Sequence, residues 1–320
     1  MVVVVSPAVV RVRRGVLFVK YLGGGREAVE EFPLAEVEGL VVVGNGVSFS
    51  SALFLYLAKL DVPVVVHGRG EDVFLYRVFS RGTAVTRRLQ YQFSWDSVRS
   101  LNYAAVFVKC KLAGFKSILG YYGSVRKTDF SEAVGFLEEC VRSAGSVGSL
   151  VELRSIEARG SQVFWRNIKT ILPEYLGFEG RVPRRPDPVN RAVDYAYSIL
   201  YGLCFHALVG SGLDPYAGFM HSERSGRPSL VYDFSEMFKP AFVHAVLYAS
   251  LKARSLSVGE DGLLEPRSTA YVSKVVFSWI KKRRRRVKHS IRESIYLKAF
   301  ELAKSIREGS SFSGYIYRVW

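Results

Sequence analysis

Four side chains beyond residue 150 have the residue types that a divalent metal site needs, and the first is Glu157. Positions at helical spacing through residues 150–172 are apolar except at Glu157, so this carboxylate lies within an apolar stripe. A buried carboxylate must be protonated, paired with a cation or bound to a metal. Gly160, one turn further on, removes side-chain bulk and predicts room for a ligand. The alternative is that Glu157 lies at the rim of the stripe and pairs with an arginine.

His221 and two further carboxylates follow within a short segment. His221 begins a polar loop rich in turn-forming residues, where a histidine has no apolar face to fill and is suited to metal or acid/base chemistry. Asp233 and Glu236 lie three residues apart, and two interpretations stay open. Asp233 is the N-cap of the apolar helix that follows, with Glu236 completing a capping box, or both carboxylates share one helical face and converge on one ion. Spacing alone favours the cap.

A basic run near residue 285 is the candidate DNA track. It follows the apolar and aromatic stretch 275–280 and consists of Lys281, Lys282, Arg283, Arg284, Arg285, Arg286 and Lys288. Such a run neutralises phosphates with little regard to base sequence. The alternative is a solvated helical face.

The composition agrees with a polyanionic partner. The 320 residues include 45 Lys and Arg against 29 Asp and Glu, a formal net charge of +16. Ribosome-associated and membrane-surface proteins share such a surplus, so charge alone does not decide between them. Three widely spaced cysteines fit neither a zinc cage nor a disulfide framework and predict a reducing compartment. The longest apolar stretches, 51–60 and 241–251, are shorter than the roughly 18 residues of a membrane span, so none is expected.

The periodicity of the chain divides it into two parts. Up to residue 86 it predicts strands at 9–12, 15–21, 40–43 and 63–66 with one embedded helix at 48–60. Beyond residue 86 the helical period dominates, with helices predicted at 98–119, 130–144, 150–172, 190–209, 234–252 and 290–307. The sequence therefore predicts an α+β fold, with a small N-terminal β-rich domain (residues 1–86) and a larger all-α domain (residues 87–320). The sequence Gly44-Asn45-Gly46 is interpreted as a tight turn, because the rest of a nucleotide-binding signature is missing.

The order and spacing of these residues resemble the CRISPR-associated spacer-integrase family, the universal core subunit of CRISPR adaptation. The matching residues are Ser155-Ile156-Glu157 with Phe164-Trp165, Gly212-Leu213-Asp214-Pro215, Gly218, His221, Leu230, Asp233, Glu236, Phe238, Lys239 and Pro240. Residues 46–50 and 62–65 are similar to the turn, helix and strand of the family's β-domain. The resemblance covers most of the chain.

The resemblance implies an endonuclease and integrase that cleaves and joins DNA when new spacers are acquired. By position it implies Glu157, His221 and Glu236 as ligands of Mg²⁺ or Mn²⁺, with Asp233 as an essential catalytic neighbour. In the ion-free protein we then expect poorly compensated negative charge among the three carboxylates.

The implied partners are DNA (as duplex, branched DNA or protospacer ends), the small second core subunit of the adaptation complex, and a second copy of the chain. Strand edges near residues 15–21 are expected to supply the homodimer contact. The implied location is the prokaryotic cytoplasm, and the scarcity of Gln, Asn, Met and Cys predicts a heat-loving source.

Two other functions stay open. The first is a general DNA repair or recombination nuclease of the same fold. The second is a non-catalytic basic nucleic-acid-binding scaffold, in which Glu157, Asp233 and Glu236 form structural salt bridges and caps.

Overall fold

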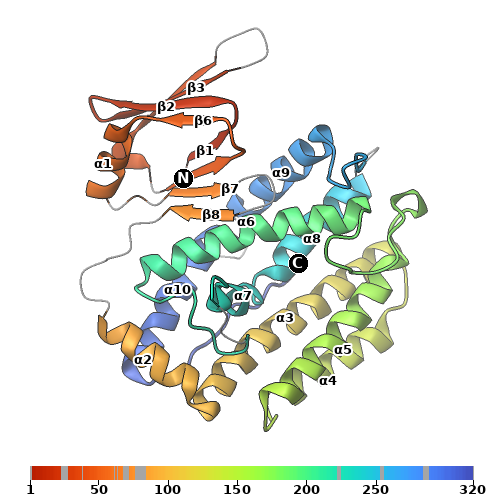
Figure 1. Cartoon of the computed structure of the whole chain (residues 1–320). Coiled ribbons are helices and arrows are strands. Elements are labelled where there is room, and N and C mark those ends of the chain that lie inside the picture. The colour runs from red at the N-terminus through yellow and green to blue at the C-terminus, as the bar shows by residue number, and fades with distance from the viewer. Residues whose placement is uncertain are drawn as a thin grey trace. The chain divides into compact units, whose positions relative to one another are not determined.

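The chain forms two compact units, residues 1–81 and 82–320 (Figure 1). The computed structural model describes residues 2–22, 28–37, 39–60, 62, 64–67, 72–75, 84–221, 225–252, 256–283 and 288–319. The first unit is rich in strands and the second is helical. The predicted α+β class, with a small β-rich part followed by a larger helical part, is confirmed.

The N-terminal unit contains two four-stranded sheets. The first has the order β1-β5-β7-β8, in which β1, β5 and β7 are parallel and β8 is antiparallel; the strands are Val2–Val5, Leu40–Val43, Val64–His67 and Asp72–Leu75. The second has the order β4-β3-β2-β6, with strands Val29–Pro33, Val16–Tyr21, Ala8–Arg13 and Val47–Phe49. Alternate valines and leucines of these strands form one apolar core with helix α1 (Ser51–Lys59) and the 3-10 turn η1 (Leu34–Glu36), as the period-2 pattern requires.

The sheet order corrects one expectation and confirms another. Strand β3 pairs with β2 on one side and with β4 on the other, so residues 15–21 do not supply a sheet edge and the expected dimer contact there is wrong. The tight turn at Gly44-Asn45-Gly46 is confirmed, because it joins β5 to β6 with Gly44 at φ +95°. A Cβ on Gly44 would lie 2.1 Å from Ser6 Oγ, and glycine avoids this clash because it has no Cβ.

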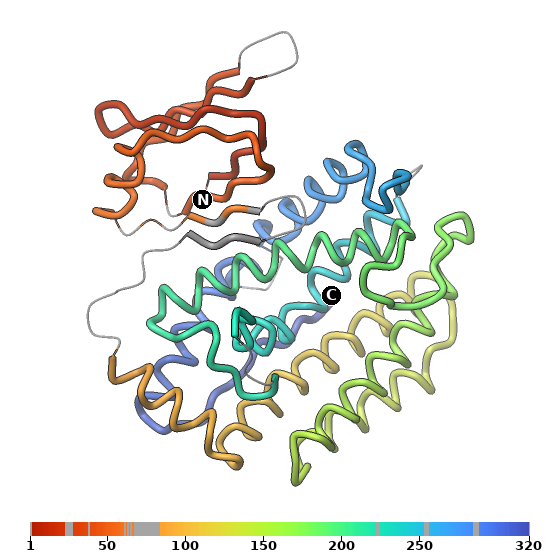
Figure 2. The backbone as a smooth tube through the Cα atoms, viewed as in Figure 1, coloured from red at the N-terminus to blue at the C-terminus, as the bar shows by residue number. Residues whose placement is uncertain are grey.

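The C-terminal unit is built from helices α2 to α10 in the part of the chain described. Their bounds are Ala84–Trp95, Ser97–Arg126, Ser131–Ser143, Leu150–Lys169, Pro188–Gly210, Ser229–Ser235, Lys239–Lys252, Pro266–Lys281 and Ile291–Glu308, with the 3-10 turn η2 at Glu174–Leu176. Helices α3, α4 and α5 run side by side, and α6 packs against α7, α8, α9 and α10 (Figure 2). Helix α6 is long and apolar enough to cross a membrane, but 67% of its most apolar window is buried inside the chain, as in a core helix.

Glycines allow α3 to approach two neighbouring elements closely. A Cβ on Gly160 of α5 would lie 2.5 Å from Leu112 Cδ2, so this glycine serves helix packing, and the expectation that it leaves room for a ligand is wrong. A Cβ on Gly114 would lie 2.6 Å from Cγ of Pro240 at the start of α8. These two contacts bring α5 and the α7–α8 junction against the same stretch of α3.

The predicted continuous helix 234–252 is interrupted. Helix α7 ends at Ser235 with Glu236 as its C-cap, and α8 begins at Lys239. Proline cannot continue a helix from the preceding residues but fits the first turn of a new one, and Pro240 is the second residue of α8. The break places Glu236 and Lys239 together at the junction.

Candidate metal centre

Glu157 pairs with a buried lysine. It lies on α5, whose buried residues include Leu153, Gly160 and Phe164, so the predicted apolar stripe is confirmed. The side chain of Glu157 is 22% exposed, and its Oε1 contacts Nζ of Lys111 from α3 and accepts a hydrogen bond of 2.9 Å from Ser161 Oγ. The alternative of pairing with a cation is therefore observed, although the partner is a lysine and not an arginine.

Glu236 lies on the other side of the same ammonium group. Its side chain is 5% exposed, and its Oε2 lies 2.7 Å from Lys111 Nζ, while its Oε1 accepts a hydrogen bond of 2.6 Å from Lys239 Nζ. Lys111 is 8% exposed, so the bridge between Glu157 and Glu236 is buried. Two carboxylates from α5 and the α7–α8 junction thus meet at one cation from α3.

The charges of this cluster balance. Burial alone would raise the pKa of the Glu236 carboxyl, but the ammonium groups of Lys111 and Lys239 outweigh burial and hold that pKa at about 2. Burial would lower the pKa of Lys111, and Glu236 and Glu157 instead raise it above its usual value. Two carboxylates face two ammonium groups, so the expectation of poorly compensated negative charge in the ion-free protein is wrong for Glu157 and Glu236.

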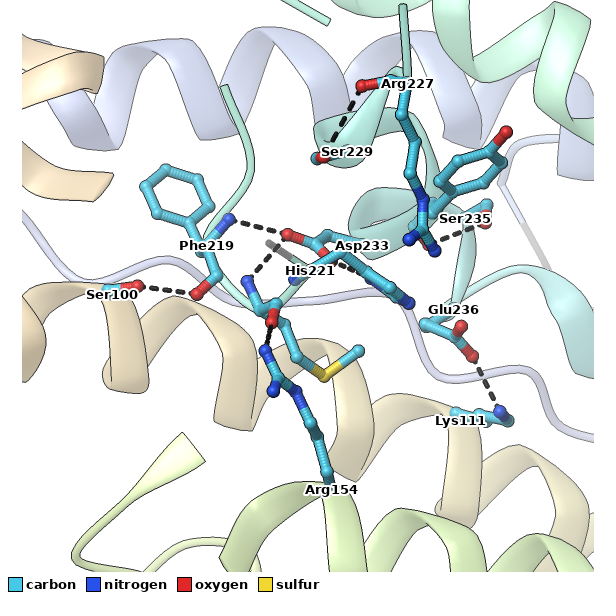
Figure 3. A network of polar contacts seen from close by, with 12 residues as sticks. Ser100, Lys111, Arg154, Phe219, His221, Arg227, Ser229, Asp233, Ser235 and Glu236 are labelled. Carbon is cyan, nitrogen blue, oxygen red and sulfur yellow. Dashed lines mark hydrogen bonds and ion pairs between the residues drawn. The ribbon is translucent and has the colours of Figure 1, made fainter. Parts of the chain in front are cut away.

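Asp233 binds the loop that carries His221. Asp233 is fully buried, and its Oδ2 accepts hydrogen bonds from the backbone N–H of Phe219 at 2.6 Å and of Met220 at 2.8 Å (Figure 3). Its Oδ1 accepts the backbone N–H of His221 at 3.1 Å and contacts Nδ1 of the His221 ring. A Cβ on Gly218 would lie 2.8 Å from Asp233 Oδ2, so glycine is required for this close approach.

These contacts decide between the two interpretations of the Asp233 and Glu236 pair. Asp233 lies inside α7 and bonds a distant loop, so the capping-box interpretation is wrong. Figure 3 shows Asp233 directed toward the loop at Phe219 and Glu236 directed toward Lys111. The two carboxylates therefore do not converge on one point.

Asp233 can nevertheless set the chemistry of His221. A carboxylate at Nδ1 favours the tautomer whose proton lies on that nitrogen, which leaves the lone pair on Nε2 for a ligand or a proton. Helix α2, for which the sequence analysis predicted no separate element, holds the start of the same loop. There the buried Gln90 donates to the carbonyls of Asp214 and Ala217, both at 2.8 Å, and accepts the backbone N–H of Asp214.

A cavity of about 520 Å³ adjoins His221. Its lining residues are Tyr201, His221, Ser225, Gly226, Arg227, Tyr232 and Lys239. The Arg227 guanidinium lies 5.3 Å from the centre of the Tyr232 ring, and Lys239 lies between the rings of Tyr197 and Tyr201 at 5.2 and 5.8 Å. Two cations and two aromatic rings in this lining suit a phosphate and a base or sugar.

The donor set fits a divalent ion, but the donors are not assembled around one point. Among the described residues, no three His, Cys, Asp or Glu side chains are close enough to hold a metal ion. Oε2 of Glu236 is buried and lies 2.7 Å from Nζ of Lys111, so an ammonium group occupies the position beside this oxygen. Two carboxylates with one imidazole are ligands that Mg²⁺ and Mn²⁺ accept.

The basic run is described only in part. Lys281 ends α9, and Lys282, Arg283 and Lys288 are exposed. The guanidinium of Arg283 donates to Glu293 Oε1 at 2.7 Å. Arg284, Arg285 and Arg286 lie outside the described residues, so the structure describes four of the seven predicted DNA contacts.

Sequence reasoning missed Lys111, and the signal for it was present. Positions 104, 108, 111, 115, 118 and 122 follow helical spacing, and all six are buried. Five are apolar or aromatic, and the sixth is Lys111. A charge inside an apolar stripe is the feature that identified Glu157, and the same feature at Lys111 indicates a cation that needs a partner of opposite charge.

The comparisons with known proteins agree with the resemblance found in the sequence. The family described as CRISPR associated protein Cas1 matches residues 1–262. The CRISPR-associated endonuclease Cas1 of Hyperthermus butylicus is 32% identical over 321 residues, covering 95% of this chain and 94% of that protein.

Solved structures share the fold of the whole chain. A casposase bound to its integration product superimposes with a TM-score of 0.83 at 20% identity, covering 98% of this chain and 93% of that one. A chain of a Cas6-RT-Cas1–Cas2 complex superimposes with a TM-score of 0.78 at 14% identity, covering 100% of this chain and 36% of that one. At these identities the likeness concerns the fold.

Proposed function

Because the chain belongs to the CRISPR-associated protein Cas1 family, we propose that it is a divalent-metal-dependent DNA endonuclease and integrase, which cleaves and joins phosphodiester bonds as new spacers are acquired. The observation that carries the proposal is the meeting of Glu157 and Glu236 beside a loop in which Asp233 orients His221. The relative from Hyperthermus butylicus is named an endonuclease, and the solved casposase is bound to an integration product.

Each residue has a distinct role in this proposal. Glu157, Glu236 and Nε2 of His221 would hold Mg²⁺ or Mn²⁺, and the imidazole favours Mn²⁺ because it accepts nitrogen more readily. A bound ion of this kind polarises the scissile phosphate and activates water for hydrolysis or a DNA 3′-hydroxyl for strand transfer. Asp233 fixes the His221 ring, and Arg227 in the cavity lining would neutralise phosphate charge.

The test is metal-dependent cleavage and joining of a branched duplex. The wild type should nick the branched substrate and join a labelled 3′-hydroxyl end to it with Mn²⁺ or Mg²⁺, and neither with EDTA. Glu157→Gln and His221→Ala should lose both reactions while retaining DNA binding. Glu138→Gln is the matched control, because Glu138 also pairs with a lysine of α3 but lies at the surface. Binding without cleavage by the wild type would support the scaffold alternative.

The proposed partners are DNA, the small second core subunit and a second copy of the chain. A solved complex that contains this fold is named for Cas1 and Cas2. The exposed basic residues Lys281, Lys282 and Lys288 suit a sequence-independent DNA track. The relatives are prokaryotic, and we assign this chain to the cytoplasm of a heat-loving prokaryote.

Helix α1 is our candidate for the homodimer contact in place of β3. It exposes Phe54, Leu55, Tyr56 and, just beyond its end, Leu60, with Leu55 66% exposed. A run of exposed apolar side chains on one short helix is typical of an interaction surface. Leu55→Asp should convert a dimer into a monomer in light scattering, whereas a dimer that survives would place the contact elsewhere.

A further inference from the structure

The ammonium group of Lys111 occupies the space between the two carboxylates that are proposed to hold the metal. It contacts Oε1 of Glu157 and lies 2.7 Å from Oε2 of Glu236. The side chain comes from α3, whose position is fixed against both partners by the close approach at Gly160 and Gly114. Lys111 is therefore held at this point by the packing of three elements.

The ammonium and a divalent ion would compete for the same oxygens. Mg²⁺ binds carboxylate oxygens at about 2.0–2.1 Å, so an ion shared by Glu157 and Glu236 would lie in the region that Lys111 Nζ now fills. Two like charges in one buried site also repel each other strongly. The two cations cannot bridge the same pair of carboxylates at the same time.

Lys239, unlike Lys111, would not compete with a divalent ion for the oxygens shared by Glu157 and Glu236. It binds Oε1 of Glu236, whereas Lys111 lies beside Oε2, and it lies against the rings of Tyr197 and Tyr201. A metal at Oε2 leaves this contact intact. Lys239 therefore compensates Glu236 in both states, while Lys111 compensates the pair only when the metal is absent.

We propose that Lys111 is an internal counter-ion that keeps the ion-free centre neutral and ordered, and that the catalytic metal binds by displacing its ammonium group. Lys111 is then a positioning residue that sets the affinity of the site for divalent ions. This inference rests on the proposed function, because it assumes that Glu157 and Glu236 are metal ligands.

The test measures Mn²⁺ binding by titration calorimetry and thermal unfolding with and without Mn²⁺, using the full chain. Lys111→Met should bind Mn²⁺ roughly tenfold more tightly than the wild type, which is about 1.4 kcal/mol. Its melting temperature should be lower without Mn²⁺ and should rise more when Mn²⁺ is added, because the ion replaces a lost internal cation.

A second variant keeps the inference testable where Lys111→Met does not fold without metal. Lys111→Arg retains a cation, and its guanidinium binds carboxylates in a rigid two-pronged arrangement that is harder to displace. It should bind Mn²⁺ more weakly than the wild type. Lys116→Met is the matched control, because Lys116 lies on the same helix and pairs with Glu138 at the surface; its Mn²⁺ affinity should equal that of the wild type.

The outcomes separate the inference from the proposed function. If Lys111→Met binds Mn²⁺ no more tightly than the wild type, or Lys111→Arg binds it as tightly, the counter-ion role is refuted while the metal site stands. If neither the wild type nor any variant binds Mn²⁺, the proposed metal-dependent function fails as well.

Discussion

Replacing the two paired carboxylates one at a time should reveal how unevenly they stabilise the helical unit. Glu236→Gln and Glu157→Gln preserve side-chain shape and remove one charge each. Glu236 faces two buried ammonium groups and is 5% exposed, so its neutralisation leaves Lys239 without its carboxylate and Lys111 with Glu157 alone, at a cost of about 3–5 kcal/mol. Glu157 is 22% exposed, and without its charge Lys111 still has Glu236, so its loss should cost only about 1–2 kcal/mol.

These losses of unfolding free energy predict clearly different melting temperatures for the two variants. For a unit of this size, 1 kcal/mol corresponds to about 2–4 °C, so Glu236→Gln should lower the melting temperature by roughly 6–20 °C and Glu157→Gln by roughly 2–8 °C. All four tryptophans lie within residues 82–320, so tryptophan fluorescence reports on the helical unit alone. The measurement is made in EDTA, with Glu138→Gln as the surface control. A Glu157 variant as unstable as the Glu236 variant, or a Glu236 variant as stable as the wild type, would refute the charge balance described above.

Three further predictions concern packing, DNA binding and thiol chemistry. Gly160→Ala should destabilise the protein by about 1–3 kcal/mol in chemical unfolding, because the new Cβ would lie 2.5 Å from a leucine of α3. Replacing Lys281 and Lys288 with Ala should reduce the slope of log Kd against log salt for duplex DNA by about 0.9 per lost contact, and an unchanged slope would assign them to a solvated face. Burial raises the pKa of the Cys110 thiol to about 12, so at pH 8 it stays protonated and should react with iodoacetamide only after unfolding; modification of the native protein would contradict its buried position.

The local pattern of the sequence predicted several of the helices and strands and indicated the candidate site residues. Strand 40–43 and the start of helix α5 at residue 150 were predicted as observed, because alternation and helical spacing depend on neighbours close in the chain. The order and spacing of Glu157, His221, Asp233 and Glu236, with the matching residues around them, indicated the family. Each of these inferences uses residue types and spacing, which the chain itself carries.

Only the tertiary structure decided what those residues contact. Asp233 and Glu236 lie three residues apart, and local spacing predicted either a cap or a shared ion. The break between α7 and α8 instead directs Asp233 to the loop at His221 and Glu236 to Lys111. The partner of Glu157 was missed for the same reason, since Lys111 lies 46 residues away in the chain and meets it only because α3 and α5 pack closely at Gly160. Long-range pairing depends on which helices pack together, and a charge in an apolar stripe shows that a partner is needed without showing where in the chain it lies.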